Sequence, residues 1–323
     1  MTSRTEQTVV IKRDITFAHA ACGDVMRPLQ MDMYRPAGRE YDRLPAVVLA
    51  FGGAFHRGSR QDDTVTEDGK SNTPIAEYCR MLATHGFAAF SVDYRLAQEE
   101  PRPGQTPVLA DMDVPLERIR VVRDILGLDP ITPERMRDVQ EAAIDDMASA
   151  FRYVCGASRR LGIDPRKVVV GGFSAGGRNA ITAAFGEAID PAGVISLSSY
   201  VPDFVVERRL LEGNALLPVL AISAENDLGY IRKALPKQHE TLRRGGGQTI
   251  WRVVPDYGHF YPADAATLDG LTKAPACTVF GEILQFLDGL YAEDDWQGQD
   301  RDDLSGLSNG NSNPNNSKAT IKC

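Results

Sequence analysis

The sequence predicts an α/β fold: a mostly parallel sheet of eight strands with helices on both faces and one inserted lid segment. Apolar runs of strand length alternate with longer stretches whose apolar residues recur at helical spacing. The central runs, such as 46–51 and 168–170, are apolar throughout, as expected of parallel strands buried on both faces. The composition, 43% hydrophobic and 25% charged, is that of a globular protein.

Eight apolar runs are the predicted strands, and they span residues 8–17, 29–34, 45–51, 88–93, 167–173, 193–198, 218–223 and 248–254. Helical patterns lie between them. One helix is expected to begin at Thr73 as N-cap, with a proline in its first turn, where a missing N–H is harmless. Another begins at Thr132 in the same way, and its apolar stripe continues to Leu161 at a spacing near 3.6 residues. A last helix is expected over 276–291.

Two segments fall outside this alternation. Residues 97–131 contain five prolines and a short helical pattern. A structureless loop of this length is uncommon in a compact domain unless it is functional, so we predict a lid over a site; a surface excursion without a role is the alternative. Residues 297–323 are rich in Asn, Ser, Gly and Asp, which predicts a disordered polar tail. The folded domain is therefore expected to comprise residues 1–296.

The charge balance excludes several functional classes. Lys plus Arg is 36 and Asp plus Glu is 44, a net charge of −8, which lacks the basic footprint of a nucleic-acid-binding protein. No run approaches the roughly 18 apolar residues of a membrane span. The first residues lack the apolar core of a secretory signal, and the five cysteines have neither disulfide nor metal-ligand spacing. We expect a cytoplasmic protein without a metal; a homodimer stays open.

The most informative stretch is Gly172-Phe173-Ser174-Ala175-Gly176, a G-x-S-x-G pattern between a predicted strand and a predicted helix. In this context the pattern is typical of a strained turn that exposes the serine hydroxyl above the sheet. The amides at the start of the following helix favour negative charge at the same point. Ser174 is therefore the candidate nucleophile. An ordinary glycine-rich turn with a capping serine is the alternative.

A serine nucleophile needs a base to take its proton. His259 follows the last predicted strand and lies 85 residues beyond Ser174, which makes it the candidate base. His239 lies in a polar helical run and His85 at a predicted helix end, so both are expected to be structural or solvated.

The base in turn needs a carboxylate. Asp227 follows the predicted strand 218–223, and in one common order of such triads the acid lies between the serine and the histidine. Glu225 and Asp256 are rivals by position. A solvated loop carboxylate is the common alternative for each of them.

Reaction at a carbonyl also needs amide donors for the oxyanion. Gly52-Gly53-Ala54 follows a predicted strand, and a Gly-Gly turn lets backbone N–H groups approach a substrate oxygen closely. The amides of Gly53, Ala54 and Ala175 are therefore the candidate oxyanion hole. No glycine-rich phosphate loop is present.

Three segments together resemble the carboxylesterase group of the α/β-hydrolase superfamily, which includes hormone-sensitive-lipase-like esterases, small esterases and aryl formamidases. They are Asp93-Tyr94-Arg95-Leu96-Ala97-Gln98-Glu99, Leu161-Gly162-Ile163-Asp164-Pro165 before the serine turn, and Gly52-Gly53-Ala54-Phe55. The resemblance spans residues 29–291. It departs from the family at Gln98, which replaces a proline, and at Phe51, which stands where the family usually has histidine. The segment after Glu99 is also longer.

The resemblance implies an α/β-hydrolase fold, a triad of Ser174, Asp227 and His259, and oxyanion donors at Gly53, Ala54 and Ala175. It implies hydrolysis of short-chain or aromatic carboxylic esters through an acyl-enzyme, with a small-molecule ester as partner and no cofactor. Candidate substrate contacts, each also a common core or rim residue, are Phe55, His56, Phe173, Tyr200 and Phe260. The same triad serves amides, formamides and lactones, and a non-catalytic hydrolase-like binding protein is a further alternative.

Overall fold

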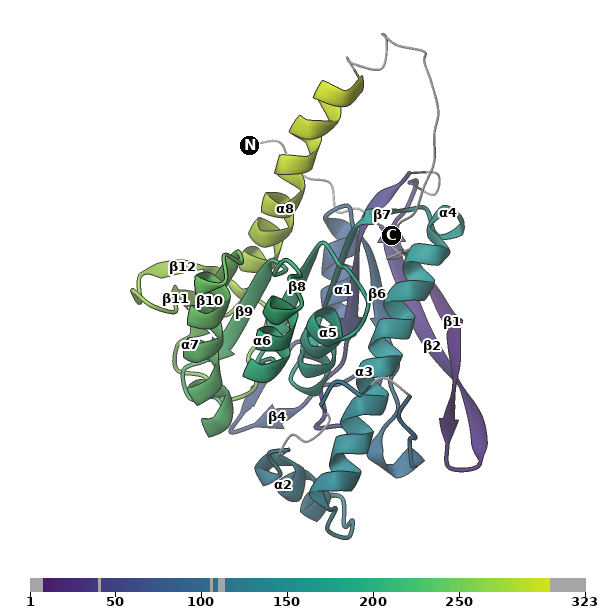
Figure 1. Cartoon of the computed structure of the whole chain (residues 1–323), viewed down its shortest axis with the longest axis vertical. Coiled ribbons are helices and arrows are strands. Elements are labelled where there is room, and N and C mark those ends of the chain that lie inside the picture. The colour runs from purple at the N-terminus through teal and green to yellow at the C-terminus, as the bar shows by residue number, and fades with distance from the viewer. Residues whose placement is uncertain (1–7, 40–41, 105–106, 110–113, 303–323) are drawn as a thin grey trace.

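The computed structural model describes residues 8–39, 42–104, 107–109 and 114–302, and of residues 292–302 it describes the backbone alone. Its central feature is one sheet of ten strands (Figure 1). In chain order the strands are β1 (Val9–Cys22), β2 (Val25–Pro36), β3 (Leu44–Ala50), β6 (Ala88–Val92), β7 (Ile163–Phe173), β8 (Gly193–Leu197), β9 (Val219–Ala224), β10 (Thr249–Val254), β11 (Ala266–Asp269) and β12 (Pro275–Thr278). A separate ribbon pairs β4 (Thr66–Glu67) with β5 (Lys70–Ser71).

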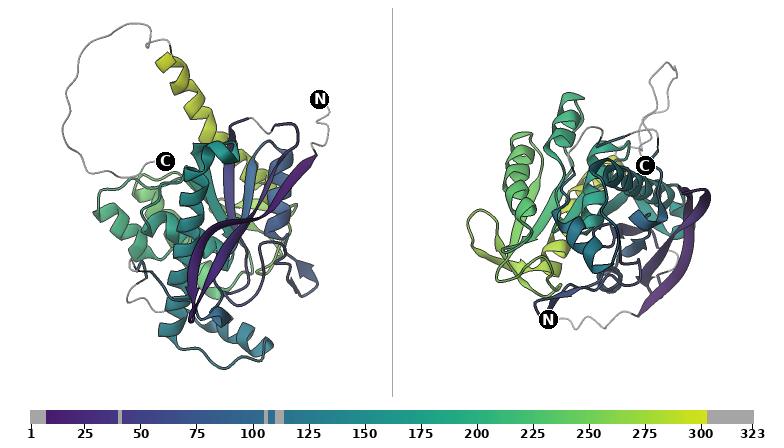
Figure 2. Two further views of the ribbon diagram at one scale, coloured as in Figure 1. Left: turned by 90° about the vertical axis from the view of Figure 1, so that its right-hand side faces the viewer. Right: turned by 90° about the horizontal axis from the view of Figure 1, so that it is seen from below.

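Across the sheet the order is β1-β2-β6-β3-β7-β8-β9-β10-β11-β12. The strands from β6 to β10 run parallel, and the pairs at both edges are antiparallel. Strands β6, β8 and β9 are buried at every position, as their unbroken apolar runs predict. The long β1–β2 hairpin lies along one edge of the sheet (Figure 2).

Helices cover both faces of the sheet. On one face α3 (Pro133–Gly156), α5 (Ala175–Gly186), α6 (Asp203–Leu211) and α7 (Gly229–Arg244) contact one another in that order. On the other face α1 (Ile75–Thr84) meets α8 (Val279–Asp302), where the rings of Tyr78 and Phe280 lie 6.5 Å apart. The short α4 (Ser158–Leu161) follows α3. The predicted fold class is thus confirmed.

The structure differs from the expectations mainly at short elements. All eight predicted strands are present, and β11 and β12, with four residues each, extend one edge. Because β12 occupies the expected start of the last helix, α8 begins at Val279; it continues to Asp302, past the predicted start of the polar tail. Residues 303–323 of that predicted tail lie outside the described residues. The expected helix from Thr132 is interrupted at Ala157, where α3 gives way to α4.

Two helix starts test the capping predictions. Thr132 caps α3 as predicted, since its hydroxyl accepts a hydrogen bond from the amide of Arg135 at 3.2 Å. Thr73 does not cap α1; its hydroxyl accepts from the amide of Ala263 at 2.8 Å, in the loop after β10. The carboxylate of Asp63 serves α1 instead by accepting from the amide of Ile75 at 2.8 Å.

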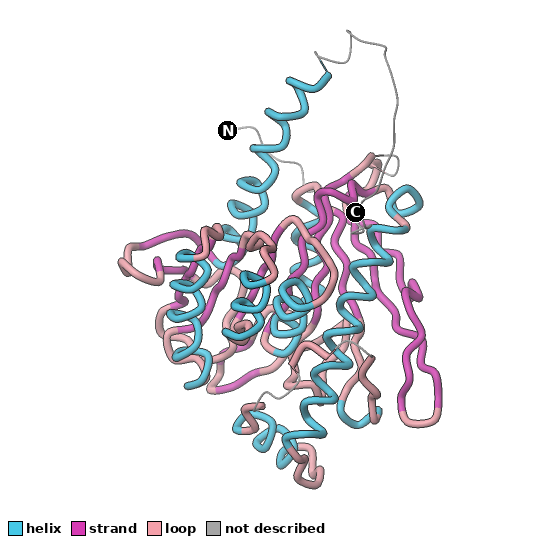
Figure 3. Tube along the Cα trace, viewed as in Figure 1, coloured by secondary structure: helices cyan, strands magenta, loops and turns pink. Residues whose placement is uncertain are grey.

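The topology gathers the predicted chemical groups at one place. Ser174 follows β7, Asp227 follows β9, His259 follows β10, and the Gly52–Ala54 turn follows β3. The carboxyl ends of parallel strands meet at one edge of a sheet, at the lower end of the molecule in Figure 3. Helix α2 (Glu117–Ile125) lies at the same end (Figures 1 and 2). Within the described ranges, no helix is long and apolar enough to cross a lipid bilayer.

Candidate active site

Ser174 lies on the sharp turn that joins β7 to α5. Its backbone has φ 52° and ψ −116°, a strained conformation for a residue with a side chain. Gly176 shows why glycine is needed here, because a Cβ at that position would lie 2.1 Å from the carbonyl oxygen of Ala50. The turn is fixed by a hydrogen bond of 2.8 Å from the amide of Ser174 to the carbonyl of Leu197. This is the geometry that the G-x-S-x-G pattern predicts.

The side chains of Ser174, His259 and Asp227 form one hydrogen-bonded chain. Ser174 Oγ lies 2.8 Å from Nε2 of His259, and Nδ1 of the same ring lies 2.6 Å from Oδ1 of Asp227. The imidazole and the carboxylate are both buried, with about 4% of each residue exposed. A carboxylate only accepts, so Nδ1 carries the proton and Nε2 is left to accept from the serine hydroxyl.

The carboxylate of Asp227 is held in place by further donors. Oδ2 accepts from the hydroxyl of Ser198 at 2.6 Å, and Oδ1 accepts from the amide of Leu228 at 2.7 Å. Burial alone would raise the pKa of Asp227. The His259 imidazole and these hydrogen bonds outweigh burial and hold the pKa below its ordinary value. The carboxylate is therefore ionised at neutral pH.

The rival groups lie elsewhere. Glu225 and Asp256 are both exposed, and Glu225 accepts from the amide of Asp256 at 3.0 Å. His239 contacts the hydroxyl of Thr249 at 3.2 Å, and His85 contacts the carbonyl of Met81 at 2.8 Å near the end of α1. The structure thus brings together the three residues that the sequence favours for the triad.

The loop after β3 forms a tight turn beside Ser174. Gly53, Ala54 and Phe55 all have positive φ, at 126°, 55° and 65°. The carbonyl of Gly53 accepts from the amides of His56 and Arg57 at 3.1 and 3.2 Å, and a Cβ on Gly53 would lie 2.0 Å from the carbonyl oxygen of Arg57. The turn therefore depends on glycine at this position.

Two of the three predicted oxyanion residues line the same pocket as Ser174, namely Ala54 and Ala175. Gly53 lines a separate depression together with Gly52, Arg57 and Asp63. Within the described part of the chain, no protein acceptor is found for the amides of Gly53, Ala54 and Ala175. Of these three residues, Ala54 and Ala175 border the pocket with Ser174.

Asp63 is a residue whose part in the loop no sequence pattern indicates. Its Oδ2 accepts from the amide of Gly52 at 2.8 Å while its Oδ1 accepts from Ile75 at the start of α1. Burial raises its pKa to about 6, although both backbone donors oppose the rise. Asp63 therefore fixes the loop to α1.

Phe51 makes an aromatic contact at the position where the esterases that the sequence resembles usually have histidine. Its ring stacks on that of Tyr94, with centroids 4.3 Å apart and planes at 23°. The hydroxyl of Tyr94 donates to the carbonyl of Phe51 at 3.0 Å. The next residue, Arg95, is buried against Asp146 of α3, with Nη2 and Oδ1 2.8 Å apart. Residues 93–99 thus hold the start of the loop after β3 through the contacts of Tyr94 with Phe51.

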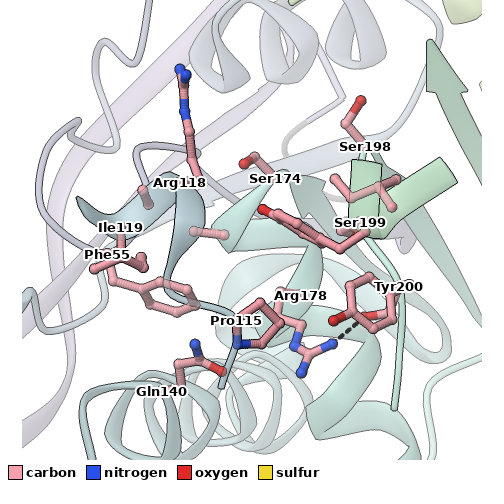
Figure 4. Close-up of a pocket in the computed structure, with 14 residues that line it drawn as sticks. Phe55, Pro115, Arg118, Ile119, Gln140, Ser174, Arg178, Ser198, Ser199 and Tyr200 are labelled. Carbon is pink, nitrogen blue, oxygen red and sulfur yellow. Dashed lines mark hydrogen bonds between the residues drawn. The ribbon is translucent and has the colours of Figure 1, made fainter. Parts of the chain in front are cut away.

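A cavity of about 60 Å³ opens beside Ser174 (Figure 4). This is room for about four water-sized groups. Its lining includes polar side chains from several elements: Arg118 of α2, Gln140 of α3, Arg178 of α5, and Ser199, Tyr200 and Tyr230. Of the predicted substrate contacts, Phe55 and Tyr200 line it. Within the described residues, no group of three or more His, Cys, Asp or Glu side chains could hold a metal ion.

The other three predicted contacts lie outside the lining. Phe173 and Phe260 pack around the imidazole of His259, at ring distances of 5.5 and 5.0 Å. His56 joins the loop to α2: Nδ1 lies 2.7 Å from the carbonyl of Ala54, and Nε2 lies 2.9 Å from Nη1 of Arg123. Burial and the charge of Arg123 lower the pKa of His56, against the Ala54 hydrogen bond, which raises it. A neutral ring fits both contacts, because it donates from Nδ1 and accepts at Nε2.

The segment 97–131 forms one wall of this pocket. Pro115, Arg118 and Ile119 line it, and Arg118 pairs with Glu67 of β4 at 2.9 Å. The buried carboxylate of Glu141 accepts from the amide of Val108 at 3.0 Å and so ties the segment to α3. Residues 105–106 and 110–113 of the segment lie outside the described residues.

No family model matches the chain. Three solved structures of esterase 2 from the Planctomycetes species Thermogutta terrifontis are similar to it. The native enzyme has a TM-score of 0.51 at 17% identity, over 90% of this chain and 93% of that chain. The propionate-bound form has 0.52 at 18%, over 90% and 95%, and the form phosphorylated by paraoxon has 0.52 at 17%, over 88% and 94%. This chain therefore has the fold of α/β-hydrolase esterases.

Proposed function

We propose that this protein is a serine hydrolase that cleaves short-chain or aromatic carboxylic esters through an acyl-enzyme. The observation that carries the proposal is the continuous hydrogen-bonded chain from Ser174 through His259 to Asp227, with the serine in the wall of a small pocket. The esterase of similar fold has been captured with propionate bound and phosphorylated by paraoxon. The motifs around Ser174 and Asp93 support placement near the hormone-sensitive-lipase-like group.

In the acylation step, Nε2 of His259 takes the proton of Ser174 as Oγ attacks the ester carbonyl carbon. The amides of Ala54, Ala175 and Gly53 donate to the oxygen, which becomes negatively charged. The ionised carboxylate of Asp227 keeps the imidazole oriented and stabilises the imidazolium. His259 then returns the proton to the alkoxide oxygen of the departing alcohol.

In the second step, water replaces the alcohol. His259 takes a proton from that water as it attacks the acyl carbon, and Ser174 leaves with the proton returned to Oγ. The pocket volume of about 60 Å³ favours a small acyl or alcohol group. Every step uses groups of this chain, and none requires a cofactor.

The test combines labelling with turnover. A fluorescent organophosphonate should label the wild-type protein once, on the peptide that contains Ser174. Ser174→Ala should abolish the label and lower kcat on p-nitrophenyl acetate by at least about a thousandfold. Near-normal turnover by Ser174→Ala, or labelling at another residue, would remove the proposal. Labelling at Ser174 without hydrolysis of any p-nitrophenyl ester from acetate to dodecanoate would move the substrate to amides, formamides or lactones.

A further inference from the structure

We infer that the substrate carries a carboxylate close to the ester, and that Arg118 and Arg57 bind it between α2 and the loop after β3. The inference rests on the proposed function, because it names a substrate class for the same site. It comes from the charges that the protein places beside Ser174.

The charged side chains that line the pocket are positive. They are Arg118 of α2 and Arg178 of α5, and none of the described lining residues is a carboxylate. Arg178 is held by Tyr200, because its Nη1 donates to the carbonyl of Tyr200 at 3.1 Å and its guanidinium lies over the same ring. In Figure 4 the guanidinium of Arg118 points away from Arg178 and Gln140. A site lined by one sign of charge favours substrates of the opposite sign.

Arg118 has one acidic partner in the protein. Its Nη1 lies 2.9 Å from Oε1 of Glu67, whose side chain is 44% exposed against 12% for Arg118. The guanidinium also lies over the ring of Phe260, 5.5 Å from the centroid, and that ring packs against the imidazole of His259. A guanidinium has five N–H donors, so Arg118 keeps donors for a substrate while it is held near the imidazole.

Arg57 adds a second positive charge, and the described residues provide no partner for it. A Cβ on Gly53 would lie 3.2 Å from Cγ of Arg57, so the stem of the side chain packs on the loop after β3. Its Nε is buried without a partner, and its terminal nitrogens make no hydrogen bond or ion pair with the described residues. Burial and the charge of Arg118 lower the pKa of Arg57, while Glu67 raises it. Two guanidinium groups therefore lie near one carboxylate.

The other acidic groups beside this loop do not supply the missing charge. Asp62 and Asp63 line the depression that also contains Arg57, but both accept hydrogen bonds from backbone amides. The charges that shift the pKa of Arg57 are those of Arg118 and Glu67. One positive charge between α2 and the loop is thus left for a ligand.

A carboxylate fits this excess of one charge. Its two oxygens match the donors of a guanidinium, and its single negative charge is smaller than that of a phosphate group. A neutral acceptor would leave the charge uncompensated, and an ammonium would be repelled. The cavity of about 60 Å³ holds about four water-sized groups, so the chain between the ester and the carboxylate is short. Monoesters of short dicarboxylic acids and esters of short hydroxy acids have this chemistry.

The test compares esters in which a carboxylate replaces an isopropyl group of nearly the same shape. Ethyl hydrogen succinate and ethyl 4-methylpentanoate differ in this way on the acyl side, and 3-acetoxypropanoate and 3-methylbutyl acetate on the alcohol side. In pH-stat assays near neutral pH, the wild-type enzyme should show kcat/KM at least about tenfold higher for the charged member of one pair, as expected of a charge-assisted hydrogen bond. The pair that shows this charge preference identifies the side of the ester that carries the carboxylate.

The charge preference should also depend on salt. It should fall as the ionic strength rises from about 0.01 M to about 1 M, because the Debye length shrinks from about 30 Å to about 3 Å.

Variants assign the charge preference to its residues. Arg118→Gln and Arg57→Gln should each lower it by about threefold to tenfold, because each removes one positive charge. Glu67→Gln should raise it, since Glu67 competes with the substrate for Arg118. Arg120→Gln removes the same charge from an exposed position on α2 and is the matched control that should keep the preference. The wild-type comparison decides the matter even where a variant does not fold.

Three results would overturn the inference. These are equal or lower kcat/KM for the charged member of both pairs, a preference that survives in both Arg118→Gln and Arg57→Gln, or a preference that Arg120→Gln lowers as much as they do. In each case hydrolysis of the uncharged esters and phosphonate labelling at Ser174 persist, which separates these results from a failure of the proposed function. Absence of both would remove the function and the inference together.

Discussion

Ser198 gives the Asp227 carboxylate a hydroxyl donor in addition to the imidazole. The hydrogen bond from Ser198 Oγ to Oδ2 is 2.6 Å long, and the hydroxyl is fully buried. Hydrogen bonds to ionised acceptors are stronger than neutral ones, and this one holds the second carboxylate oxygen while the first contacts Nδ1 of His259. Ser198 therefore acts through Asp227 as a positioning residue.

We predict that Ser198→Ala lowers kcat by about tenfold with little change in KM, because the carboxylate loses one donor while the pocket keeps its shape. The control is Ser196→Ala. Ser196 is equally buried, but its hydroxyl bonds to Ser199 and not to Asp227. Steady-state kinetics on p-nitrophenyl acetate checks this, and equal losses in both variants would show that buried hydroxyls here support only the fold.

Asp63 is also a positioning residue, because its two carboxylate oxygens accept hydrogen bonds from the amides of Gly52 and Ile75. In Asp63→Asn one carboxylate oxygen becomes an NH₂ group, which cannot accept the hydrogen bond from the backbone amide that it faces. We predict a fall in kcat of at least about tenfold, since donors near the oxyanion are displaced. Asp62→Asn at the neighbouring exposed position should leave kcat unchanged. A normal kcat for Asp63→Asn in a folded protein would contradict the assigned role.

The triad residues could be predicted because each has a local signal. Ser174 lies in a pattern that also shapes its backbone, and Asp227 and His259 follow apolar strands at predictable positions. Ser198 and Asp63 carry no such signal, because their hydrogen-bond partners lie in other elements of the fold.

The inserted segment 97–131 is fastened to the domain at points that matter for the pocket. Helix α2 buries Ile119 and Val122, while the Arg123 guanidinium contacts His56, which in turn contacts Ala54 in the oxyanion loop. The position of α2 and that of the loop are therefore coupled through one neutral imidazole.

We predict that Arg123→Ala raises KM for p-nitrophenyl butyrate by about threefold to tenfold and speeds amide hydrogen exchange over 117–125, since it removes one hydrogen bond that holds α2 against the loop. Arg120→Ala, at an exposed position on the same helix, is the control and should alter neither quantity. Unchanged exchange in Arg123→Ala would mean that burial of Ile119 and Val122 alone holds the helix.

Element prediction succeeded where the apolar pattern was long. All eight strands that it indicated are present. The clearest signals came from the parallel strands β6, β8 and β9, because strands buried on both faces need continuous apolar runs. The short strands β11 and β12 have four residues each, too few to show a period, and they arise from antiparallel pairing of β11 with β10 and of β12 with β11. The cap at Thr73 was wrong for a similar reason: a tertiary donor, the amide of Ala263, competes for the same hydroxyl.

For the whole molecule, two carboxyl groups with raised pKa values, those of Asp63 and Asp145, determine part of the response to pH. Burial raises the pKa of Asp63 and of Asp145 from 3.8 to about 6 each. At pH values between about 4 and about 6, the two carboxyl groups of the folded protein keep protons that the unfolded chain has released. The free energy of unfolding therefore falls as the pH rises from about 4 to about 6 through these two groups. Asp227 contributes to this pH dependence with the opposite sign, because its pKa is lower in the folded protein than in the unfolded chain. Its contribution to the free energy of unfolding is present at pH values above the ordinary pKa and is lost as the pH falls through the lowered pKa.

We predict that Asp145→Asn reduces this decline in the free energy of unfolding between pH 4.5 and 6.5, because asparagine binds no proton in either state. Urea unfolding at a series of pH values measures the slope. Asp138→Asn, on the same helix, is the control. An unchanged slope in Asp145→Asn would mean that Asp145 titrates alike in the folded and unfolded chain.

The stretch from Asp63 to Thr73 touches both halves of the site. Asp63 holds the loop that carries the oxyanion amides, while Lys70 donates to the carbonyl of Asp256 and Thr73 accepts from Ala263 on either side of His259. If heat or mild denaturant detaches this stretch, the loop with the oxyanion amides and the loop with His259 should both lose their positions in one step, while the ten-stranded sheet remains folded. Activity should then be lost at a lower temperature than the one at which the sheet unfolds. Proteolytic cleavage of one peptide bond between residues 63 and 73 should also abolish activity.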